Sequence, residues 1–272
     1  MKNEKSSPNS DSLPFLKWTG GKRWLTSEIE QLVPENYGRY IEPFVGGGAI
    51  FFHLHPWPAT LSDINPDLIN AYRQVRDNVE EVITRLRRLR IDRDVYGEIR
   101  NSEPRTPIAR AVRFLYLNRT AFNGIYRVNQ QGRFNVPFGC KPGTVVCDPE
   151  LLRSASLSLQ NRKLRTCDFE VAIESANEGD FIYADPPYTT KHDNNGFRRY
   201  NEEIFAWEDQ IRLAECCRQA VARGAYVIVS NANHRPIVDL YKGFGCKRLS
   251  RRSLISGVAQ GRGSVKECIL FR

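Results

Sequence analysis

The tetrapeptide Asp185-Pro186-Pro187-Tyr188 combines residue types that could prepare a heteroaromatic amine for reaction. The lone pair of such an amine is delocalised into its ring, which makes it a poor nucleophile. A carboxylate at Asp185 and a backbone carbonyl at Pro186 could accept hydrogen bonds from its two N–H groups, which would hold the nitrogen in a more tetrahedral geometry with its lone pair exposed. The prolines stiffen the turn and supply no N–H donor, and Tyr188 offers a flat stacking face. The pattern indicates catalysis by positioning and fixed dipoles, without a covalent intermediate.

A Pro-Pro turn after a strand is also an ordinary structural feature, so the interpretation depends on a second motif. Residues 42–49 (EPFVGGGA) form a glycine-rich turn between two apolar runs, and its glycines allow a ligand to approach the backbone closely. It is not a P-loop, because the Gly-Lys-Ser/Thr ending is absent. Phe51 also stands where a full dinucleotide motif has its third glycine. Alone, this turn fits a structural role as well as a cofactor site.

Asp63 strengthens the cofactor interpretation. It ends the next predicted strand, about 20 residues further on, where a carboxylate can accept hydrogen bonds from both ribose hydroxyls of an adenosine. Its alternative role is to cap the helix that begins at Pro66. We expect Asn65 to provide that cap instead.

The composition is that of a globular protein with a basic balance. The 272 residues are 41% hydrophobic and 26% charged, which allows a packed core. Lys and Arg number 40 against 31 Asp and Glu, giving a net charge of +9 and a pI of about 9.3. This balance favours a polyanionic partner such as nucleic acid. Many basic proteins bind no nucleic acid, so charge alone does not decide.

The cysteines and the N-terminus point to a cytoplasmic protein. Seven cysteines, an odd number, with no Cys-x-x-Cys pair, argue against a disulfide framework and against a zinc site. His53 and His55 have no second ligand pair nearby, so we expect no metal. Residues 1–12 are polar and unlike a signal peptide, and are expected to form a flexible leader. No stretch approaches the roughly 18 apolar residues of a membrane span.

Strands and helices alternate around these motifs. We predict strands at 39–44, 59–63, 180–184 and 225–230, and a closing antiparallel pair at 247–252 and 265–271. Helices are predicted at 66–77, 79–89, 107–117 and 207–222. The alternation predicts an α/β fold, a mostly parallel mixed sheet with helices on both faces.

The middle of the chain departs from this pattern. Residues 118–143 are rich in Asn, Gly, Arg and aromatic residues, and Gln131-Gly132 could turn a hairpin between 125–129 and 133–136. We therefore predict a leader at 1–12, a catalytic domain at 13–71 and 161–272, and an inserted, mostly helical domain at 72–160. The basic, Gly-rich loop at 256–264 fits a flexible turn as well as a segment that closes over DNA or cofactor.

Taken together, the chain resembles the DNA adenine methyltransferases of the GATC-modifying type (Dam-like, alpha group, D12 class). The resemblance covers about residues 14–271. Four motifs carry it: FLKWTGGK at 15–22, EPFVGGG at 42–48, NVPFG at 135–139 and DPPY at 185–188. It implies a Rossmann-like, S-adenosylmethionine-dependent methyltransferase domain with an inserted DNA-recognition domain that carries a β-hairpin. The implied reaction is methyl transfer, without a metal, to N6 of an adenine flipped out of duplex DNA.

The resemblance also implies roles for individual residues. The tetrapeptide Asp185-Pro186-Pro187-Tyr188 would be catalytic. The cofactor contacts would be Trp18, Lys22, Pro43, Phe44, Asp63, Asp168, Phe169 and Asp185. The DNA contacts would be Lys17, Asn118, Arg119, Phe122, Asn123, Arg127 and Asn135.

Within the DNA-contact set, Lys17 resembles the family residue that reads the first guanine, and Arg127 resembles the arginine that reads a later guanine. The arginine fork matches O6 and N7 of guanine. Asn118, Arg119 and Asn123 would position phosphates. Phe122 stands where the GATC enzymes usually have a tyrosine that enters the duplex. Thr120 and Tyr126 also differ from the family pattern, so a related site that begins with GAT is an alternative to GATC.

Two other functions fit parts of the sequence. The tetrapeptide also suits a cytosine amine or an RNA base, although RNA enzymes usually lack such an insert and more often have Asn at the first position. An inactive DNA-binding regulator would usually show a decayed tetrapeptide or glycine turn, and both are intact here. A cognate restriction endonuclease is a possible partner that the sequence alone does not reveal.

Overall fold

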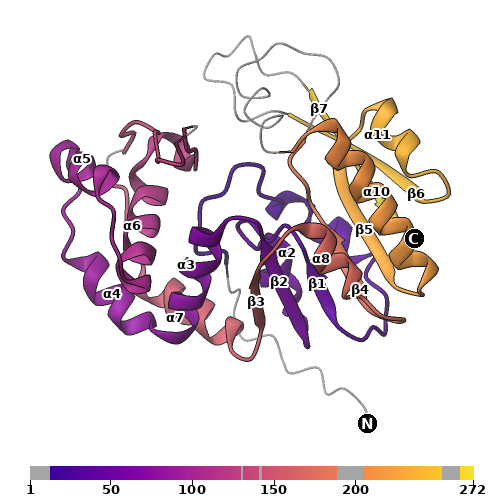
Figure 1. The fold of residues 1–272 in the computed structure, drawn as a ribbon, viewed down its shortest axis with the longest axis horizontal. Helices are drawn as coiled ribbons and strands as arrows, with labels where there is room; N and C mark the ends of the chain where they lie inside the picture. Colours follow the sequence, from indigo (N-terminus) through magenta and orange to yellow (C-terminus); the bar gives the residue numbers. More distant parts are fainter. Residues whose placement is uncertain (1–12, 130, 141–142, 189–204, 253–263) are drawn as a thin grey trace. The chain divides into compact units, whose positions relative to one another are not determined.

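The computed structural model describes residues 13–129, 131–140, 143–188, 205–252 and 264–272 (Figure 1). The chain divides into two compact units. Unit 1 comprises Met1–Thr26, Gly46–His55 and Asn65–Leu164, and unit 2 comprises Ser27–Val45, Pro56–Ile64 and Arg165–Arg272. These units follow contacts and not function, so the predicted leader and the predicted catalytic and inserted domains stay predictions. The Gly-rich loop at 256–264 lies almost wholly outside the described residues.

A seven-stranded mixed sheet has the order β3-β2-β1-β4-β5-β7-β6 (Figure 1). Strands β2, β1, β4 and β5 run parallel, whereas β7 runs antiparallel to both β5 and β6. This confirms the predicted α/β sheet and its closing antiparallel pair. The strands are β1 Tyr40–Glu42, β2 Ala59–Asp63, β3 Lys163–Thr166, β4 Phe181–Ala184, β5 Tyr226–Ala232, β6 Gly245–Arg252 and β7 Ser264–Phe271.

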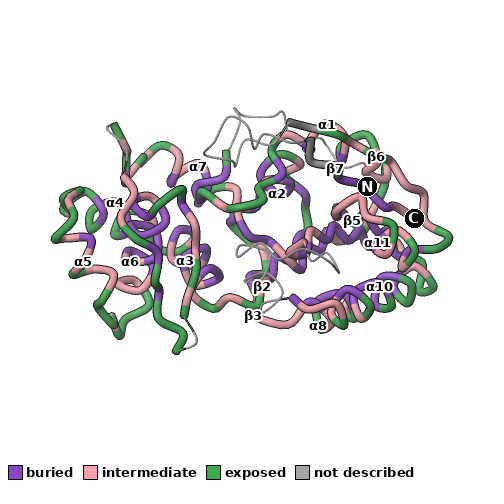
Figure 2. The backbone as a smooth tube through the Cα atoms, turned by 90° about the horizontal axis from the view of Figure 1, so that it is seen from above, coloured by how far each residue is buried: buried purple, intermediate pink, exposed green. Residues whose placement is uncertain are grey.

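In unit 2, one face of the sheet is apolar and packs against helices. Alternate residues of the strands, among them Ile182 and Val227, form a buried core with α8 (Phe169–Glu174), α10 (Trp207–Ala222) and α11 (Arg235–Leu240). Figure 2 shows α10 with a buried side and an exposed side, as expected for an amphipathic helix. The short helix α1 (Thr26–Glu30) is joined to β6 by an ion pair between Glu28 and Lys247.

Unit 1 is mostly helical. Its central helix α6 packs against α3, α4 and α5, and most of its second half is buried. Side chains cap several of these helices by accepting bonds from first-turn N–H groups, as Asn65 does for α3 and Asp148 for α7. The helices are α2 Ala49–Leu54, α3 Pro66–Asp77, α4 Val79–Arg87, α5 Arg93–Asn101, α6 Pro107–Thr120 and α7 Pro149–Leu159, with short 3-10 helices at Arg23–Leu25 and Phe122–Gly124.

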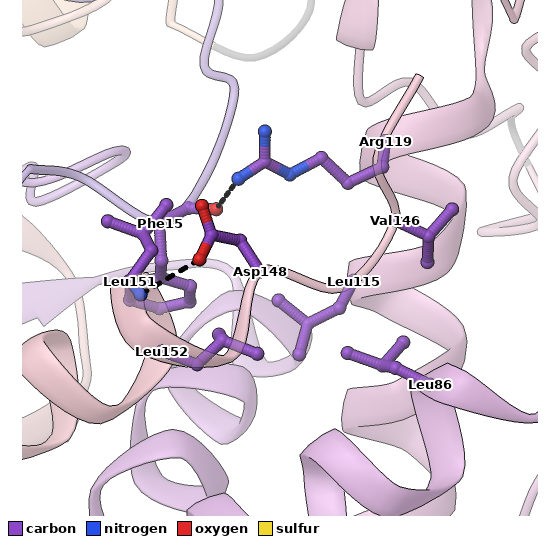
Figure 3. Close-up of a pocket in the computed structure, with 8 residues that line it drawn as sticks. All are labelled: Phe15, Leu86, Leu115, Arg119, Val146, Asp148, Leu151 and Leu152. Atoms are coloured by element: carbon purple, nitrogen blue, oxygen red, sulfur yellow. Dashed lines mark hydrogen bonds between the residues drawn. The ribbon is translucent and has the colours of Figure 1, made fainter. Parts of the chain in front are cut away.

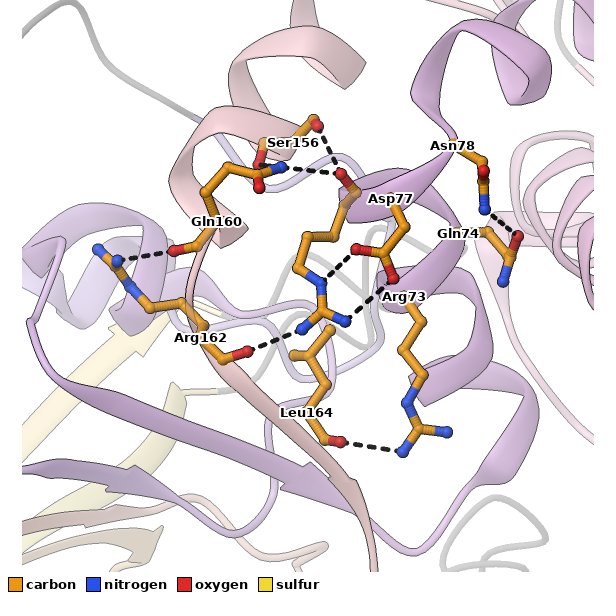
Figure 4. A network of polar contacts seen from close by, with 9 residues as sticks. Arg73, Gln74, Asp77, Asn78, Ser156, Gln160, Arg162 and Leu164 are labelled. Atoms are coloured by element: carbon orange, nitrogen blue, oxygen red, sulfur yellow. Dashed lines mark hydrogen bonds and ion pairs between the residues drawn. The ribbon is translucent and has the colours of Figure 1, made fainter.

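Arginines of α3 bind the backbone at the start of β3 (Figure 4). Arg73 donates to the carbonyl of Leu164 at 2.9 Å, and Arg76 donates to the carbonyl of Arg162 at 2.8 Å. Ser156 of α7 donates in turn to the carbonyl of Arg76 at 3.0 Å. Through these side-chain bonds α3, α7 and the start of β3 are joined within unit 1.

Several predicted elements are confirmed, and others were missed. The helices at 66–77 and 207–222 have the predicted bounds, and α6 continues to Thr120, three residues beyond its predicted end. Helices α5, α7, α8 and α11 and strand β3 were not predicted. None of the described helices is long and apolar enough to cross a membrane.

Candidate active-site and nucleic-acid-binding residues

The tetrapeptide follows directly on β4, at the carboxyl end of a parallel strand flanked by β1 and β5. Ligands of doubly wound sheets bind at this edge. Ser230 of β5 donates a 2.7 Å hydrogen bond from Oγ to Oδ1 of Asp185, and the hydroxyl of Tyr183 lies 3.0 Å from the same Oγ. The catalytic candidate is therefore a partly exposed carboxylate held by a buried hydroxyl.

The rest of the tetrapeptide is also held by side chains. Tyr188 donates to Oε2 of Glu267 at 2.8 Å, and Gln210 donates to the carbonyl of Pro187 at 3.2 Å. Among the described residues, no donor bonds to the carbonyl of Pro186, the group expected to accept from a substrate amine. Burial, together with the nearby charges of Asp185 and Glu267, raises the pKa of Tyr188 well above its usual value, so its hydroxyl stays protonated.

Five of the unit 2 cofactor candidates lie at the carboxyl ends of strands: Pro43 and Phe44 follow β1, Asp63 ends β2, and Asp168 and Phe169 follow β3. Two backbone bonds hold these segments side by side, from Val45 N to Ser62 O at 2.9 Å and from Cys167 N to Asp63 O at 3.3 Å. The rings of Phe44 and Phe169 stack with centroids 5.3 Å apart, and Phe205 joins them at 5.6 Å and 5.7 Å. Pro43, which precedes Phe44 in the sequence, is buried. Asp63 is partly exposed.

Asn65, and not Asp63, caps α3, accepting bonds from Asp67 N at 3.0 Å and Leu68 N at 3.2 Å. The predicted cap is thus confirmed, and the carboxylate of Asp63 does not serve as the helix cap.

Asp168 is held by an arginine that the sequence did not reveal. Its carboxylate caps α8 by accepting from Glu170 N at 2.9 Å, and Arg212 of α10 binds both of its oxygens, at 2.9 Å and 3.0 Å. The same guanidinium lies 4.2 Å from the ring centroid of Phe169 and pairs with Glu170 and Asp209. Partial burial lowers the pKa of Arg212, but these carboxylates outweigh it and raise that pKa overall.

In unit 1, Trp18 lies against the second half of the glycine turn. A Cβ added to Gly46 or Gly47 would lie 2.8 Å or 2.9 Å from Trp18, so both positions require glycine. The indole also stacks on Tyr126 with centroids 6.1 Å apart. Lys22 is buried, and its Nζ donates to the carbonyl of Gly20 at 2.9 Å. Trp18 thus contacts the glycine turn, whereas Lys22 holds the backbone at Gly20.

Lys17, expected to read a guanine, has a firmly held backbone and an exposed side chain. Asn118 is buried, accepts from Lys17 N at 2.9 Å and donates to Lys17 O at 2.7 Å. A Cβ at Gly124 would lie 2.9 Å from Cβ of Lys17. The observed contacts of Asn118 therefore position Lys17, and its expected contact with a phosphate stays a prediction.

Arg119 lines a small, mostly aliphatic pocket of unit 1, shown in Figure 3 with Leu115, Val146 and Leu152. Its guanidinium donates to the carbonyl of Phe15 at 2.8 Å, and burial lowers its pKa. In this structure Arg119 joins α6 to the segment that carries Lys17.

The predicted hairpin is a tight antiparallel turn stabilised by isolated bridges. Val128 pairs with Phe134, and Asn129 N donates to Arg133 O at 2.8 Å. Arg127 is exposed, and its Nε donates to Oδ1 of Asn135 at 2.8 Å, which joins two of the expected DNA contacts.

Phe122 begins a 3-10 turn on the surface. Its side chain is 51% exposed, although its backbone N donates to Pro137 O at 2.9 Å. A Cβ at Gly139 would lie only 2.3 Å from Cα of Phe122, so the glycine of the NVPFG motif is needed there. The next residue, Asn123, is exposed and adopts a left-handed backbone with φ of 54°. The loop thus presents an aromatic ring and an amide to solvent from a fixed backbone.

The positive charge of the chain is concentrated in unit 1. Unit 1 has 23 Lys and Arg against 12 Asp and Glu, whereas unit 2 has 17 against 19. All seven predicted DNA contacts belong to unit 1, and the whole tetrapeptide belongs to unit 2. The expected DNA contacts therefore belong to the unit that has the basic excess. Across the described residues, no cluster of three or more His, Cys, Asp or Glu could hold a metal ion.

Sequence reasoning missed Ser230, Gln210, Glu267 and Arg212. A signal existed for Ser230, since Ser230-Asn231 is a polar pair at the end of an apolar run, next to a strand that ends in the tetrapeptide. The other three come from α10 and β7, and their roles depend on the register of the sheet.

Comparison with known proteins gives consistent matches over most of the chain. The family model described as D12 class N6 adenine-specific DNA methyltransferase matches residues 18–255. The chain is 39% identical to the type II methyltransferase M1.LlaDCHI of Lactococcus lactis subsp. cremoris, over 94% of each chain. It is 36% identical to the type II methyltransferase M.MjaIII of Methanocaldococcus jannaschii, over 89% of this chain and 92% of that protein. A DNA adenine methylase of Haemophilus influenzae is 34% identical, over 98% and 96%.

Proposed function

Because the chain belongs to the family of D12 class N6 adenine-specific DNA methyltransferases, we propose that it methylates N6 of an adenine flipped out of duplex DNA, at GATC or a related GAT-containing site. The observation that carries this proposal is the tetrapeptide at the carboxyl end of β4, with Asp185 held by Ser230 and Tyr188 held by Glu267. A base within a duplex cannot reach such a site, so flipping, at a cost of a few kcal/mol, is part of the proposal.

Each residue of the tetrapeptide has a task in this reaction. Asp185 accepts a hydrogen bond from one N–H of the adenine amine, and the carbonyl of Pro186 accepts a hydrogen bond from the other. These two bonds direct the nitrogen lone pair at the methyl carbon. Tyr188 stacks on the flipped base. Bound S-adenosylmethionine supplies an electrophilic methyl group. The rate gain comes mainly from orientation, which can contribute about 7–11 kcal/mol in favourable cases.

The cofactor candidates of each unit suit an adenosine-containing donor. In unit 2, Asp63 would bind the ribose hydroxyls, Asp168 and Phe169 the adenine, and Pro43 with Phe44 the pocket wall. The two glycines packed on Trp18 leave no space for a side chain in the turn that would approach the cofactor. Trp18 and Lys22 are proposed as the unit 1 contacts.

Unit 1 would read the target. We propose that Lys17 and Arg127 each read a guanine and that the exposed ring of Phe122 enters the duplex near the vacated position. Asn123, Arg119, Asn118 and Asn135 would support these contacts at the phosphates or by holding the readers. Phenylalanine keeps the stacking function of tyrosine at position 122 and loses its hydroxyl.

The test is single-molecule methylome sequencing of DNA from a methylation-deficient host that expresses the chain. We expect N6-methyladenine within one short motif that contains GAT. Replacing Asp185 with alanine should abolish the marks and leave DNA binding largely intact. Marks on cytosine, or methylation only of RNA, would overturn the target assignment, and retained turnover in the Asp185→Ala variant would overturn the catalytic assignment.

Two of the relatives named above are type II methyltransferases, which suggests a restriction-modification role for this chain. We therefore propose that its methylation protects DNA from a cognate restriction endonuclease. Methylated and unmethylated plasmid should then differ in their digestion by an endonuclease of the same recognition sequence.

A further inference from the structure

Side-chain alternation along β4 and β5 separates an apolar face of the sheet from a polar one. Ala184 pairs with Val229 in the parallel register, and both belong to the apolar core under the helices. Tyr183 and Ser230 point to the opposite face, where their hydroxyl oxygens lie 3.0 Å apart. Asp185 continues this alternation beyond the end of β4 and meets Ser230 on the same face.

The hydroxyls of Tyr183 and Ser230 form a relay that ends on Asp185. Burial raises the pKa of Tyr183 well above its usual value, and the charge of Asp185 adds to this effect, so the phenol stays protonated. Ser230 donates to the carboxylate, and its oxygen can then accept from Tyr183. Hydrogen bonds in such a chain strengthen one another in a buried environment.

Glu267 reaches the polar face from the antiparallel strand β7. It pairs with Ala232, two residues beyond Ser230, so its side chain lies on the same face as that of Ser230. Glu267 is 2% exposed, and its carboxylate accepts a hydrogen bond from the hydroxyl of Tyr188. The stacking residue is thereby anchored at the far end of its ring.

A buried amide pair holds the tetrapeptide from the other face. Asn231 follows Ser230 and points toward α10, where its Nδ2 donates to Oε1 of Gln210 at 3.0 Å. Gln210 then donates to the carbonyl of Pro187. Both amides are fully buried, a costly placement unless their hydrogen bonds are made.

We propose that Ser230, Glu267 and Gln210 are positioning residues that fix the tetrapeptide in its reactive geometry before DNA binds. This inference rests on the catalytic role proposed above for Asp185. Groups aligned in advance need no reorganisation during the reaction, so their effect falls on the methyl-transfer step and not on substrate binding. The three residues act on Asp185, Tyr188 and Pro187, respectively.

The first test compares Ser230→Ala with Thr60→Val. Thr60 is a buried residue of β2 whose hydroxyl has no partner among the described residues, so its variant controls for the loss of a buried hydroxyl as such. With both substrates saturating, Ser230→Ala should lower the single-turnover methylation rate about 10- to 100-fold. Its affinities for S-adenosylmethionine and DNA and its melting temperature should stay close to wild type. Thr60→Val should methylate at the wild-type rate.

The second test uses a conservative rescue. Glu267→Gln keeps an acceptor for Tyr188 and should retain most of the single-turnover rate. Glu267→Ala should lower that rate by a factor similar to that of Ser230→Ala. Equal rates for the two Glu267 variants would overturn the anchor on Tyr188. Tyr183→Phe alone should lower the single-turnover rate. Combined with Ser230→Ala it should lower the rate little further, because the relay is already broken in Ser230→Ala.

The outcomes separate this inference from the proposed function. If Asp185→Ala is inactive while folded Ser230→Ala retains a rate within about threefold of wild type, the positioning inference is wrong and the function stands. If Asp185→Ala itself retains turnover, the proposed function fails. Should Ser230→Ala not fold, Tyr183→Phe tests the same relay, and a wild-type rate for that variant overturns it.

Discussion

Replacing Arg212 with alanine should weaken the binding of S-adenosylmethionine more than it slows methyl transfer. Arg212 holds both oxygens of Asp168, the residue proposed to bind the cofactor adenine, and also pairs with Glu170 and Asp209. Without the guanidinium, three neighbouring carboxylates repel one another, and Asp168 retains only its bond as the helix cap. The carboxylate can then rotate away from the adenine.

The size of this effect follows from the contacts and their exposure. A hydrogen bond to a charged group contributes about 1.5–3 kcal/mol when buried, whereas an exposed ion pair contributes about 0–1 kcal/mol. The side chain of Arg212 is 37% exposed, so a value between these limits applies. We expect a loss of about 1–2 kcal/mol, which corresponds to a dissociation constant about 5- to 30-fold higher.

Isothermal titration of S-adenosylmethionine into the protein without DNA measures this constant directly. Arg212→Lys should recover only part of the affinity, because an ammonium group cannot bind both carboxylate oxygens as a planar fork does. Arg218→Ala is the matched control, since Arg218 lies on the same helix and pairs with Glu215, away from the cofactor residues. Wild-type affinity in Arg212→Ala, or an equal loss in Arg218→Ala, would refute the reasoning.

Three further changes test other parts of the structure. Arg127→Ala should cost about 1–3 kcal/mol of discrimination at one guanine, measured as methylation of single-base variants of the site, whereas a uniform loss would indicate a phosphate contact. Gly139→Ala must displace Phe122 and should slow methylation about 100-fold, with reduced 2-aminopurine fluorescence from the flipped base and unchanged cofactor affinity. Burial, with smaller effects of nearby cysteines, raises the pKa of Tyr241 well above 10.0, so its contribution to stability is complete below pH 10.0 and is lost above it. Tyr241→Phe, which removes a hydroxyl with no partner among the described residues, should make urea unfolding less sensitive to alkaline pH, and an unchanged pH dependence would contradict this.

Elements with a clear local signal were predictable from the sequence. The Asn65-Pro66 pair marks the start of α3, because it combines a capping side chain with a proline at the first helical position, and the structure confirms both. The strands β2 and β4 are short runs of mostly buried residues, and an acidic residue ends β2 and directly follows β4. By contrast, α8 and α11 have six residues each, too few for a helical period to emerge, and their packing on the sheet stabilises them.

The candidate site likewise contains parts that the sequence predicts and parts that only the fold brings together. The tetrapeptide and the glycine turn are each one continuous stretch of sequence, so the chemistry of each could be inferred from residue types and spacing alone. Glu267 lies 79 residues from Tyr188, and Arg212 lies 44 residues from Asp168, so each meets its partner only through the order of strands and helices. Sequence patterns describe local periodicity and carry no information on the register that brings β7 beside β5.

Variants in the two units should affect different steps, DNA binding in one case and methyl transfer in the other. Unit 2 has a slight excess of acidic residues and carries the catalytic candidate Asp185. Unit 1 has the basic excess, and a substitution that removes one cation bound to a phosphate should reduce the salt dependence of DNA binding by a slope of about 0.9. Removing the guanine reader proposed at Arg127 should instead change the discrimination between target sites while the single-turnover rate at saturating cognate DNA is preserved. Variants of Ser230 or Glu267 should do the reverse, because the groups that they hold act on the bound base and not on the DNA backbone.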